Sequence, residues 1–349
     1  MRPLKLMAGG SVLTIAAGLA TGASASCTAI NVLSWEGYVN DAWVTPFEEE
    51  TGIEVIRTYV GSNDEYMAKL AAGGTEYDTV TIVSSLAERA IGAGFVQPLD
   101  QSKLPHLAQI FEGFRNLDFI QKEGELYGVP TYWGTQPVTV NADAIPEGDD
   151  FGILFDPQYE GRIGMWQDVT TIADVASYMG YDNLWTLSDE ELEAVKQKMI
   201  EQKPLVRTYW SQAGEAIELF ASGEIVASNS WNYITEALRA EGVNVREFVP
   251  ETPLGWLDSN FVVSSSECVD EAHSFIDYLI SPKAQAAIGE ASGYTVTNPQ
   301  SREFMDSEVW ERLYMDEGPD VIDRIVFWQD IPRRGRYLEI LNEVKAARQ

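Results

Sequence analysis

Large aromatic side chains stand beside carboxylates at several places in this sequence. Trp35, Glu36 and Tyr38 follow the first apolar run of the chain, and Trp256 and Asp258 lie two residues apart in "GWLDSNF". Aromatic rings attract cations to their faces, and a carboxylate supplies a charged hydrogen-bond acceptor. Together these residue types could form a cage for an organic cation, provided that the fold brings them to one place.

Further candidates follow other runs that predict strands. They are Asp168, Trp231, Tyr294 and the neighbours Trp328 and Gln329, with Trp133 in "PTYWGT" as another aromatic residue. Ligands of open α/β sheets bind outside the carboxyl ends of the strands. Core packing is the alternative for any single Trp, but core strands seldom end repeatedly in Trp beside Asp or Glu.

Short β-type runs alternate with helical patterns, which predicts an α/β fold with parallel strands. Strands are expected at 28–34, 53–60, 77–83, 161–168, 225–231 and 258–265, and helices at 44–52, 63–73, 85–94, 171–180, 189–202, 213–223 and 269–282. Gly52 is expected to end its helix, and Asn63 to cap the start of the next one. The pattern restarts after residue 134 without a Pro/Ser-rich linker, so strands crossing between two lobes could join them.

Residues 1–25 have the pattern of a secretory leader. Arg2 and Lys5 give a positive start, an apolar run follows, and Ala23-Ser24-Ala25 provides a small-x-small cleavage signal. A membrane anchor is the alternative, but the run is broken by Gly, Ser and Thr and falls short of the ~20 apolar residues that a spanning helix needs. We therefore expect a soluble mature protein in the periplasm.

Two cysteines remain in the mature chain, Cys27 and Cys268. An even pair in an oxidising compartment favours a disulfide. Lipidation of Cys27 is the alternative, but Ser24 stands where lipoprotein signals usually have Leu. We expect a Cys27–Cys268 bridge.

The formal charge of −30 and the pI of about 4.3 argue against nucleic acid and against an anionic membrane as partners. Most of this charge is expected to form a solvated acidic surface. The chain has no P-loop, no G-x-G-x-x-G after a strand and no G-x-S-x-G, so no cofactor is expected. His106 and His273 lack neighbours at metal-ligand spacing, so no metal site is expected. A hydrolase with a carboxylate pair stays open, because 54 acidic residues make such pairs inevitable.

Several segments together resemble one protein family. They are "SWEGYV", "GIEVIRTYVGSNDEYMAKL", "YDTVTIVSS", "YGVPTYWGTQPVTVN", "YEGRIGMWQD", "SWNYITEALRAEG", "GWLDSNFVV" and "SGYTVTNPQ". In this order the mature chain resembles, nearly end to end, the periplasmic spermidine/putrescine-binding proteins of polyamine ABC importers. The resemblance implies a type II periplasmic-binding-protein fold, in which two lobes of mostly parallel sheet flanked by helices enclose a ligand cleft. Residues 28–134 and 256–300 would form the first lobe, and residues 135–255 and 301–349 the second.

The resemblance also implies a non-enzymatic, monomeric binding protein that delivers a polyamine such as putrescine or spermidine to the permease subunits of the importer. Ligand contacts are then expected from Trp35, Glu36, Tyr38, Ser85, Asp168, Trp231, Trp256, Asp258, Tyr294 and Gln329. A ferric-iron carrier is another class within such folds, but its site typically needs adjacent tyrosines, and the sequence has no Tyr-Tyr pair.

Three departures from the family pattern bear on the ligand. Gly37 stands where the family usually has an acid, and Thr171 stands where a second acid is expected. Ser84 and Ser85 replace an aromatic residue near the end of the third strand. The aromatic residues of the cage are kept, but it has fewer acids to pair with ammonium groups. A smaller amine or a quaternary ammonium compound is therefore the alternative ligand.

Overall fold

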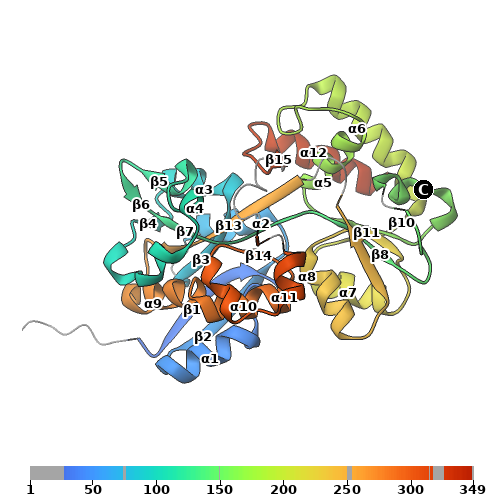
Figure 1. Cartoon of the computed structure of the whole chain (residues 1–349). Coiled ribbons are helices and arrows are strands. Elements are labelled where there is room, and N and C mark those ends of the chain that lie inside the picture. The colour runs from blue at the N-terminus through green and yellow to red at the C-terminus, as the bar shows by residue number, and fades with distance from the viewer. Residues whose placement is uncertain are drawn as a thin grey trace, which may run out of the picture.

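The computed structural model describes residues 27–73, 76–148, 150–249, 254–313, 315–316 and 326–347. The expected secretory leader, residues 1–25, lies outside this part of the chain. The described residues form two sheets side by side, with helices packed around each (Figure 1). None of their helices is both long enough and apolar enough to cross a bilayer. The expected α/β class is confirmed.

The larger sheet has the strand order β14-β7-β13-β3-β1-β2, and β4 and β15 also pair with β13. Its strands are β1 (Ala29–Trp35), β2 (Glu54–Val60), β3 (Thr79–Val83), β4 (Val96–Gln97), β7 (Gly128–Thr135), β13 (Leu254–Val263), β14 (Thr295–Val296) and β15 (Val326–Phe327). β1 is parallel to β2 and β3, whereas β13 is antiparallel to β3 and β7. β15 is parallel to β13, so the sheet is mixed: it is parallel at the β1–β2 edge, and most of the pairs made by the long central strand β13 are antiparallel.

The smaller sheet has the order β10-β9-β11-β8-β12. Its strands are β8 (Val138–Asn141), β9 (Ile163–Trp166), β10 (Val206–Trp210), β11 (Ala227–Asn229) and β12 (Val245–Phe248). β9 is parallel to β10 and β11, and β8 is antiparallel to β11 and β12. A separate two-stranded ribbon pairs β5 (Gln121–Lys122) with β6 (Glu125–Leu126).

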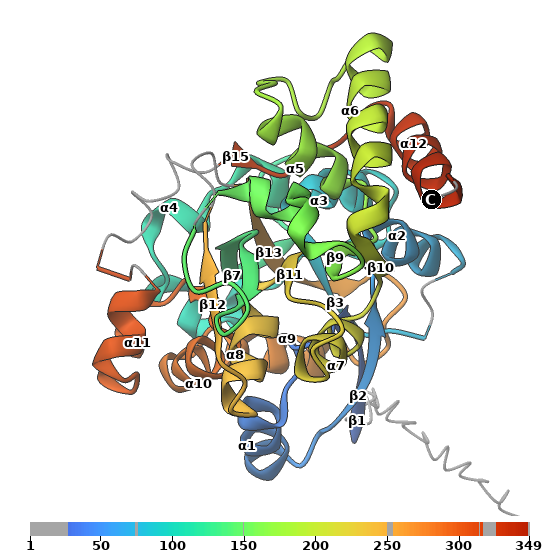
Figure 2. The same cartoon turned by 90° about the vertical axis from the view of Figure 1, so that its right-hand side faces the viewer.

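The chain passes directly from one sheet to the other. Residues 136–137 are all that separates β7 of the larger sheet from β8 of the smaller one. Later in the chain, β15 pairs with β13 of the larger sheet, whereas α12 (Arg334–Ala346) lies beside α6 (Asp189–Gln202), where Lys196 and Glu343 form an ion pair of 2.9 Å (Figure 2). Residues 326–347 thus contact the larger sheet through β15 and helix α6 through α12, and the expected lobe boundaries stay a prediction.

The remaining α-helices lie between the strands along the chain. They are α1 (Asp41–Thr51), α2 (Asn63–Ala71), α3 (Ser84–Gly92), α4 (Glu112–Arg115), α5 (Thr170–Tyr178), α7 (Ala213–Ala221), α8 (Asn232–Ala240), α9 (Val269–Leu279), α10 (Pro282–Ser292) and α11 (Ser307–Arg312). Gly52 ends α1 in the left-handed conformation, with φ 74°, as expected. The prediction that Asn63 caps α2 is wrong by one residue, because the Ser62 side chain accepts the hydrogen bond from the Glu65 N–H.

The expected disulfide is confirmed. Cys27 and Cys268 are bonded, with their Cα atoms 5.7 Å apart, which ties the residues before β1 to the start of α9. The Cys27 N–H also donates to Oε1 of Glu271 over 2.9 Å. These three residues form the one group of potential metal-ligand atoms found among the described residues, and its two sulfurs are joined to each other.

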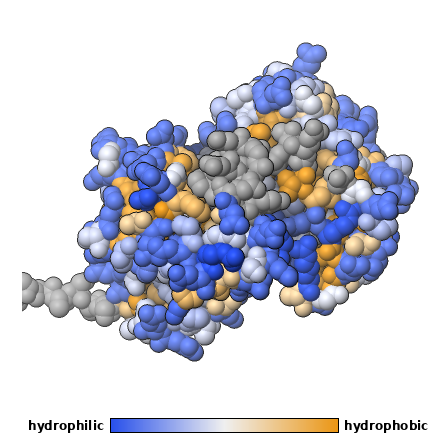
Figure 3. Space-filling view, viewed as in Figure 1, coloured by the Kyte–Doolittle hydropathy of each residue, from blue (hydrophilic) through white to orange (hydrophobic). Residues whose placement is uncertain are grey.

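Polar residues cover most of the face seen in Figure 3, with smaller apolar areas between them. This face is therefore mostly polar, and the acidic character that the net charge predicts for it stays a prediction.

Candidate ligand-binding site

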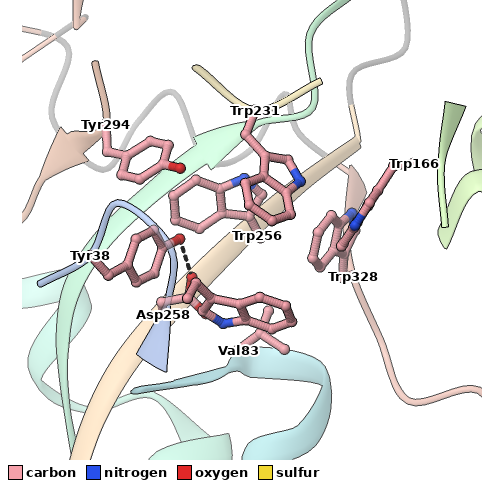
Figure 4. A pocket seen from close by; sticks show the side chains of 9 residues that line it. Tyr38, Val83, Trp166, Trp231, Trp256, Asp258, Tyr294 and Trp328 are labelled. Atoms are coloured by element: carbon pink, nitrogen blue, oxygen red, sulfur yellow. Dashed lines mark hydrogen bonds between the residues drawn. The ribbon is translucent and has the colours of Figure 1, made fainter. Parts of the chain in front are cut away.

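Nine side chains from both sheets surround a cavity of about 20 Å³ (Figure 4). They are Trp35, Tyr38, Val83, Trp166, Trp231, Trp256, Asp258, Tyr294 and Trp328, here called the aromatic box. Trp166 ends β9 and Trp231 follows β11, both in the smaller sheet, whereas the others belong to strands of the larger sheet or to the residues next to them. Each of the nine is at most 6% exposed. The box therefore lies between the two sheets and is shielded from bulk water.

The rings of the box pack against one another in edge-to-face and stacked pairs. Trp166 and Trp231 meet edge to face at 5.2 Å, and Trp166 stacks with Trp328 at 5.6 Å. Trp256 meets Tyr294 edge to face at 4.7 Å. Ring faces carry the negative part of the aromatic quadrupole, so this lining suits a cation.

Asp258 provides the carboxyl group of the box. Tyr38 donates a hydrogen bond to Oδ2 of Asp258 over 2.5 Å, whereas Oδ1 is buried without any hydrogen-bond partner. Burial raises the pKa of Asp258 to about 7, although the Tyr38 hydrogen bond lowers it. No Lys, Arg or His lines the box. A cation placed beside Oδ1 would give this buried carboxylate the partner that the protein itself does not supply.

The geometry of strand β13 explains why Trp256 and Asp258 line the same cavity. Side chains two residues apart on a strand point to the same face, and both residues line the box as the sequence predicts. All ten residues of β13 are buried, with β7 on one side and β3 on the other. The carboxylate is thus held by one of the least exposed strands of the fold.

Two expected acids do not line the box. Oε2 of Glu36 accepts a hydrogen bond from the backbone N–H of Gly214, in the first turn of α7, over 3.0 Å. Oδ2 of Asp168 accepts from the backbone N–H of Asn63 over 3.1 Å and lies 3.8 Å from Nη2 of Arg334. Both carboxylates therefore join segments that follow strands of different sheets.

Other contacts add to this junction. Arg334 holds Asp64 through two hydrogen bonds of 2.6 and 3.0 Å. The indole of Trp166 donates to the carbonyl oxygen of Gly61 over 3.2 Å. A Cβ atom on Gly61 would lie 2.1 Å from the carbonyl oxygen of Ser211, so the two backbones meet closely there. We call these contacts, with those of Glu36 and Asp168, the cross-sheet contacts.

Ser85 and Gln329 also lie outside the box. They line a neighbouring hollow that shares Trp328 with the box. Ser85 is half-buried, and Gln329 is exposed.

The positions of the missing family acids are occupied differently. A Cβ atom on Gly37, which has φ 93°, would lie 2.7 Å from the Tyr233 ring, so an acidic side chain does not fit there. Thr171 is fully buried outside the box and donates to the carbonyl oxygen of Trp166 over 2.7 Å.

The structure adds Val83 and Trp166 to the candidate residues. Of the candidate neighbours Trp328 and Gln329, it places Trp328 in the box, although a ligand contact was expected from Gln329. Trp166 lies two residues before the expected Asp168. The signal available in the sequence was the aromatic residue itself at a strand end. Val83 carries no chemical signal, because an apolar residue at the end of β3 reads as core.

Comparison with known proteins identifies the family. The family model for bacterial extracellular solute-binding proteins matches residues 42–313. The chain is 26% identical over 302 residues to the putrescine-binding periplasmic protein PotF of Escherichia coli K12, covering 81% of each chain. It is 22% identical over 326 residues to the spermidine/putrescine-binding periplasmic protein 1 of Haemophilus influenzae, covering 91% of this chain and 89% of that one.

A solved structure agrees with these matches. A protein from Listeria monocytogenes, described as a spermidine/putrescine ABC transporter, superposes with a TM-score of 0.82 at 25% identity, covering 92% of this chain and all of that one. The family match covers most of the chain and the structural match supports the two-sheet fold, so this chain belongs to the bacterial extracellular solute-binding proteins.

Proposed function

We propose that this protein binds a cationic amine of the polyamine class or a related smaller amine in the aromatic box and delivers it to the permease of an ABC importer. The observation that carries the proposal is the buried Oδ1 of Asp258, which has no partner and is surrounded by ring faces. A buried carboxylate is costly unless it is paired with a cation. Relatives named as putrescine- and spermidine-binding proteins support the ligand class.

Location and partners follow from the same proposal. The secretory leader at residues 1–25 would export the chain to the periplasm, where it acts as a monomer and meets the permease subunits. The relatives are periplasmic proteins by name, and the disulfide between Cys27 and Cys268 suits an oxidising compartment.

A hydrolase with a carboxylate pair fits the site less well. Such an enzyme needs a second carboxyl group facing the same substrate bond, and Asp258 is the one carboxyl group that lines the box. Glu36 and Asp168 are engaged in the cross-sheet contacts. The protein therefore acts by binding rather than by catalysis.

Isothermal titration calorimetry with small ligands of different charge tests the proposal. Putrescine, spermidine, choline and butylamine supply cations, while butan-1-ol and butyrate supply a neutral and an anionic control. We expect binding of at least one of the cations and none of the two controls. Absence of binding to every cation, by a protein that unfolds cooperatively and carries the disulfide, would contradict the proposed function.

A further inference from the structure

We propose that the ligand of the aromatic box is a compact monoammonium compound that carries an oxygen acceptor at its other end, rather than a diamine or longer polyamine. This inference rests on the proposed function and specifies its ligand. It follows from two buried polar atoms without partners in the box: Oδ1 of Asp258, which accepts hydrogen bonds, and Nε1 of Trp328, which donates one.

The box can pair with one positive charge. Asp258 is 2% exposed and is the one carboxyl group among the nine lining residues. In Figure 4 the hydroxyl group of Tyr38 lies beside Asp258 and can add an acceptor oxygen for one ammonium head. A second ammonium enclosed by the remaining Trp rings would have no anion, and a buried unpaired charge is strongly disfavoured.

Among the described residues, no second acid lines the box, and Glu88 and Asp330 line the neighbouring hollow instead. Oε2 of Glu36 accepts from the Gly214 N–H, and Asp168 binds the Asn63 N–H near Arg334. The Tyr233 ring fills the space that an acidic side chain at Gly37 would need. The protein thus has no described carboxylate free to face a second ammonium in the box.

The indole of Trp328 indicates which group the other end of the ligand carries. Its indole is 6% exposed, and its Nε1–H is buried without an acceptor. An indole N–H is a donor only, so an ammonium cannot satisfy it, whereas a hydroxyl or carbonyl oxygen can. Trp43 and Trp185 also have buried Nε1 atoms without partners, but neither lines the box, and they therefore serve as controls.

Size and charge complete the description. The cavity of about 20 Å³ has room for about one water molecule, so the rings or the sheets must move apart for any amine, and a compact ligand needs the smallest movement. With no Lys or Arg in the lining, a neutral oxygen fits this end better than a carboxylate does. An amino alcohol has the required combination.

Four probes of equal chain length separate these features in calorimetric titrations of the intact protein. Putrescine and 4-aminobutan-1-ol differ only in the second group, an ammonium in one and a hydroxyl in the other. Butylamine has neither, and 4-aminobutyrate tests a carboxylate at the same place. We expect 4-aminobutan-1-ol to bind at least about tenfold tighter than putrescine, because it has no second ammonium that would be buried without an anion. It should also bind tighter than butylamine and 4-aminobutyrate.

Two Trp variants test whether the oxygen end of the ligand contacts Trp328. Trp328→Phe keeps a ring and removes the N–H, so it should abolish the advantage of 4-aminobutan-1-ol over butylamine while keeping the preference for both over putrescine. Trp185→Phe removes an unpartnered N–H outside the box and should leave all the ratios unchanged.

The outcomes distinguish this inference from the proposed function. If putrescine or spermidine binds as tightly as 4-aminobutan-1-ol or more tightly, the proposed function stands and the monoammonium inference fails. If 4-aminobutyrate binds most tightly, the neutral oxygen is wrong and the acceptor end is a carboxylate. If 4-aminobutan-1-ol and butylamine bind equally to the unmodified protein, the acceptor at Trp328 is refuted. If no cation binds, both proposals fail.

Discussion

Tyr38 donates its hydroxyl hydrogen to Oδ2 of Asp258 across 2.5 Å, which links the turn after β1 to the central strand β13, 220 positions later in the chain. Both groups are buried, and burial raises the pKa of each. The hydrogen bond holds one oxygen of the carboxyl group, and the other oxygen has no partner among the described residues.

Tyr38→Phe should weaken amine binding. Without the hydroxyl, Asp258 loses the one hydrogen bond that lowers its pKa, so less of it is ionised at pH 7. A hydrogen bond to a charged group contributes about 1.5–3 kcal/mol, so we expect a loss of about tenfold or more in affinity by calorimetry. Tyr337→Phe is the control, because its buried hydroxyl donates to the Leu184 carbonyl outside the box. Equal affinities in both variants would contradict this role of Tyr38.

Ligand affinity should depend on pH through Asp258. Its pKa in the unliganded protein is about 7, and a cation pairs with the ionised form. Affinity should be nearly constant above pH 8 and should fall by up to about tenfold per pH unit below pH 7. The titratable groups that feel the charge of this carboxylate are Tyr38, Tyr66, Tyr132 and Tyr294, and burial raises the pKa of each, so they stay neutral in this range. Calorimetry from pH 5.5 to 8.5 checks the profile, and a flat profile would contradict it.

The free energy of unfolding of the unliganded protein should depend on pH in the opposite direction to the affinity. An Asp whose pKa is raised by folding binds more protons in the native state, so the free energy of unfolding falls as pH rises from about 4, the unfolded value, to about 7. Asp174, also buried with a pKa raised to about 7, contributes in the same window. Asp258→Asn should therefore reduce the slope without removing it, as urea unfolding at several pH values can show. An unchanged slope would mean that Asp258 is ionised throughout.

The cross-sheet contacts should matter for binding although, apart from Trp166, their residues lie outside the box. Gly61→Ala places a Cβ atom 2.1 Å from the Ser211 carbonyl oxygen, so the two backbones must separate. Since the box takes side chains from both sheets, affinity should fall at least about tenfold for every amine. Gly92→Ala is the matched control, because no atom lies within 4 Å of its new methyl group. Wild-type affinity in Gly61→Ala would show that this contact is not needed.

The disulfide should stabilise the fold without affecting the box. It closes a loop with a sequence separation of 241 residues, for which the chain-entropy model gives up to about 5 kcal/mol. The double variant Cys27→Ser, Cys268→Ser should unfold at lower urea concentration and bind amines with unchanged affinity. Two alkylatable thiols in the native exported protein, measured by mass spectrometry, would contradict the bridge.

Periodicity made much of the fold predictable. The stripe of Ala272, Phe275, Ile276 and Leu279 is buried in α9 as its spacing indicates. Two-residue spacing in β13 correctly placed Trp256 and Asp258 on the same cavity. Both features are local, because they depend only on the geometry of one helix or one strand.

The rest of the site depended on contacts between distant segments. The composition around Glu36 and Asp168 could not show that Gly214 and Asn63 would hold them away from the box. At Trp328 and Gln329 a shift of one residue changes which side chain lines the box, since neighbours in an extended segment point in opposite directions. Such choices are made by tertiary packing, which a single sequence does not display.

The most direct test of the central claim is a titration of Asp258→Asn with the tightest-binding amine at pH 8. The substitution keeps the shape of the side chain and removes the charge that the cation needs. We predict a loss of about 2–4 kcal/mol in binding free energy, as when one partner of a buried charge pair is removed, with the fold unchanged. Asp277→Asn is the control, because this carboxylate is 9% exposed and is paired with His106 outside the box. An affinity of Asp258→Asn within a factor of two of the wild type would contradict the account.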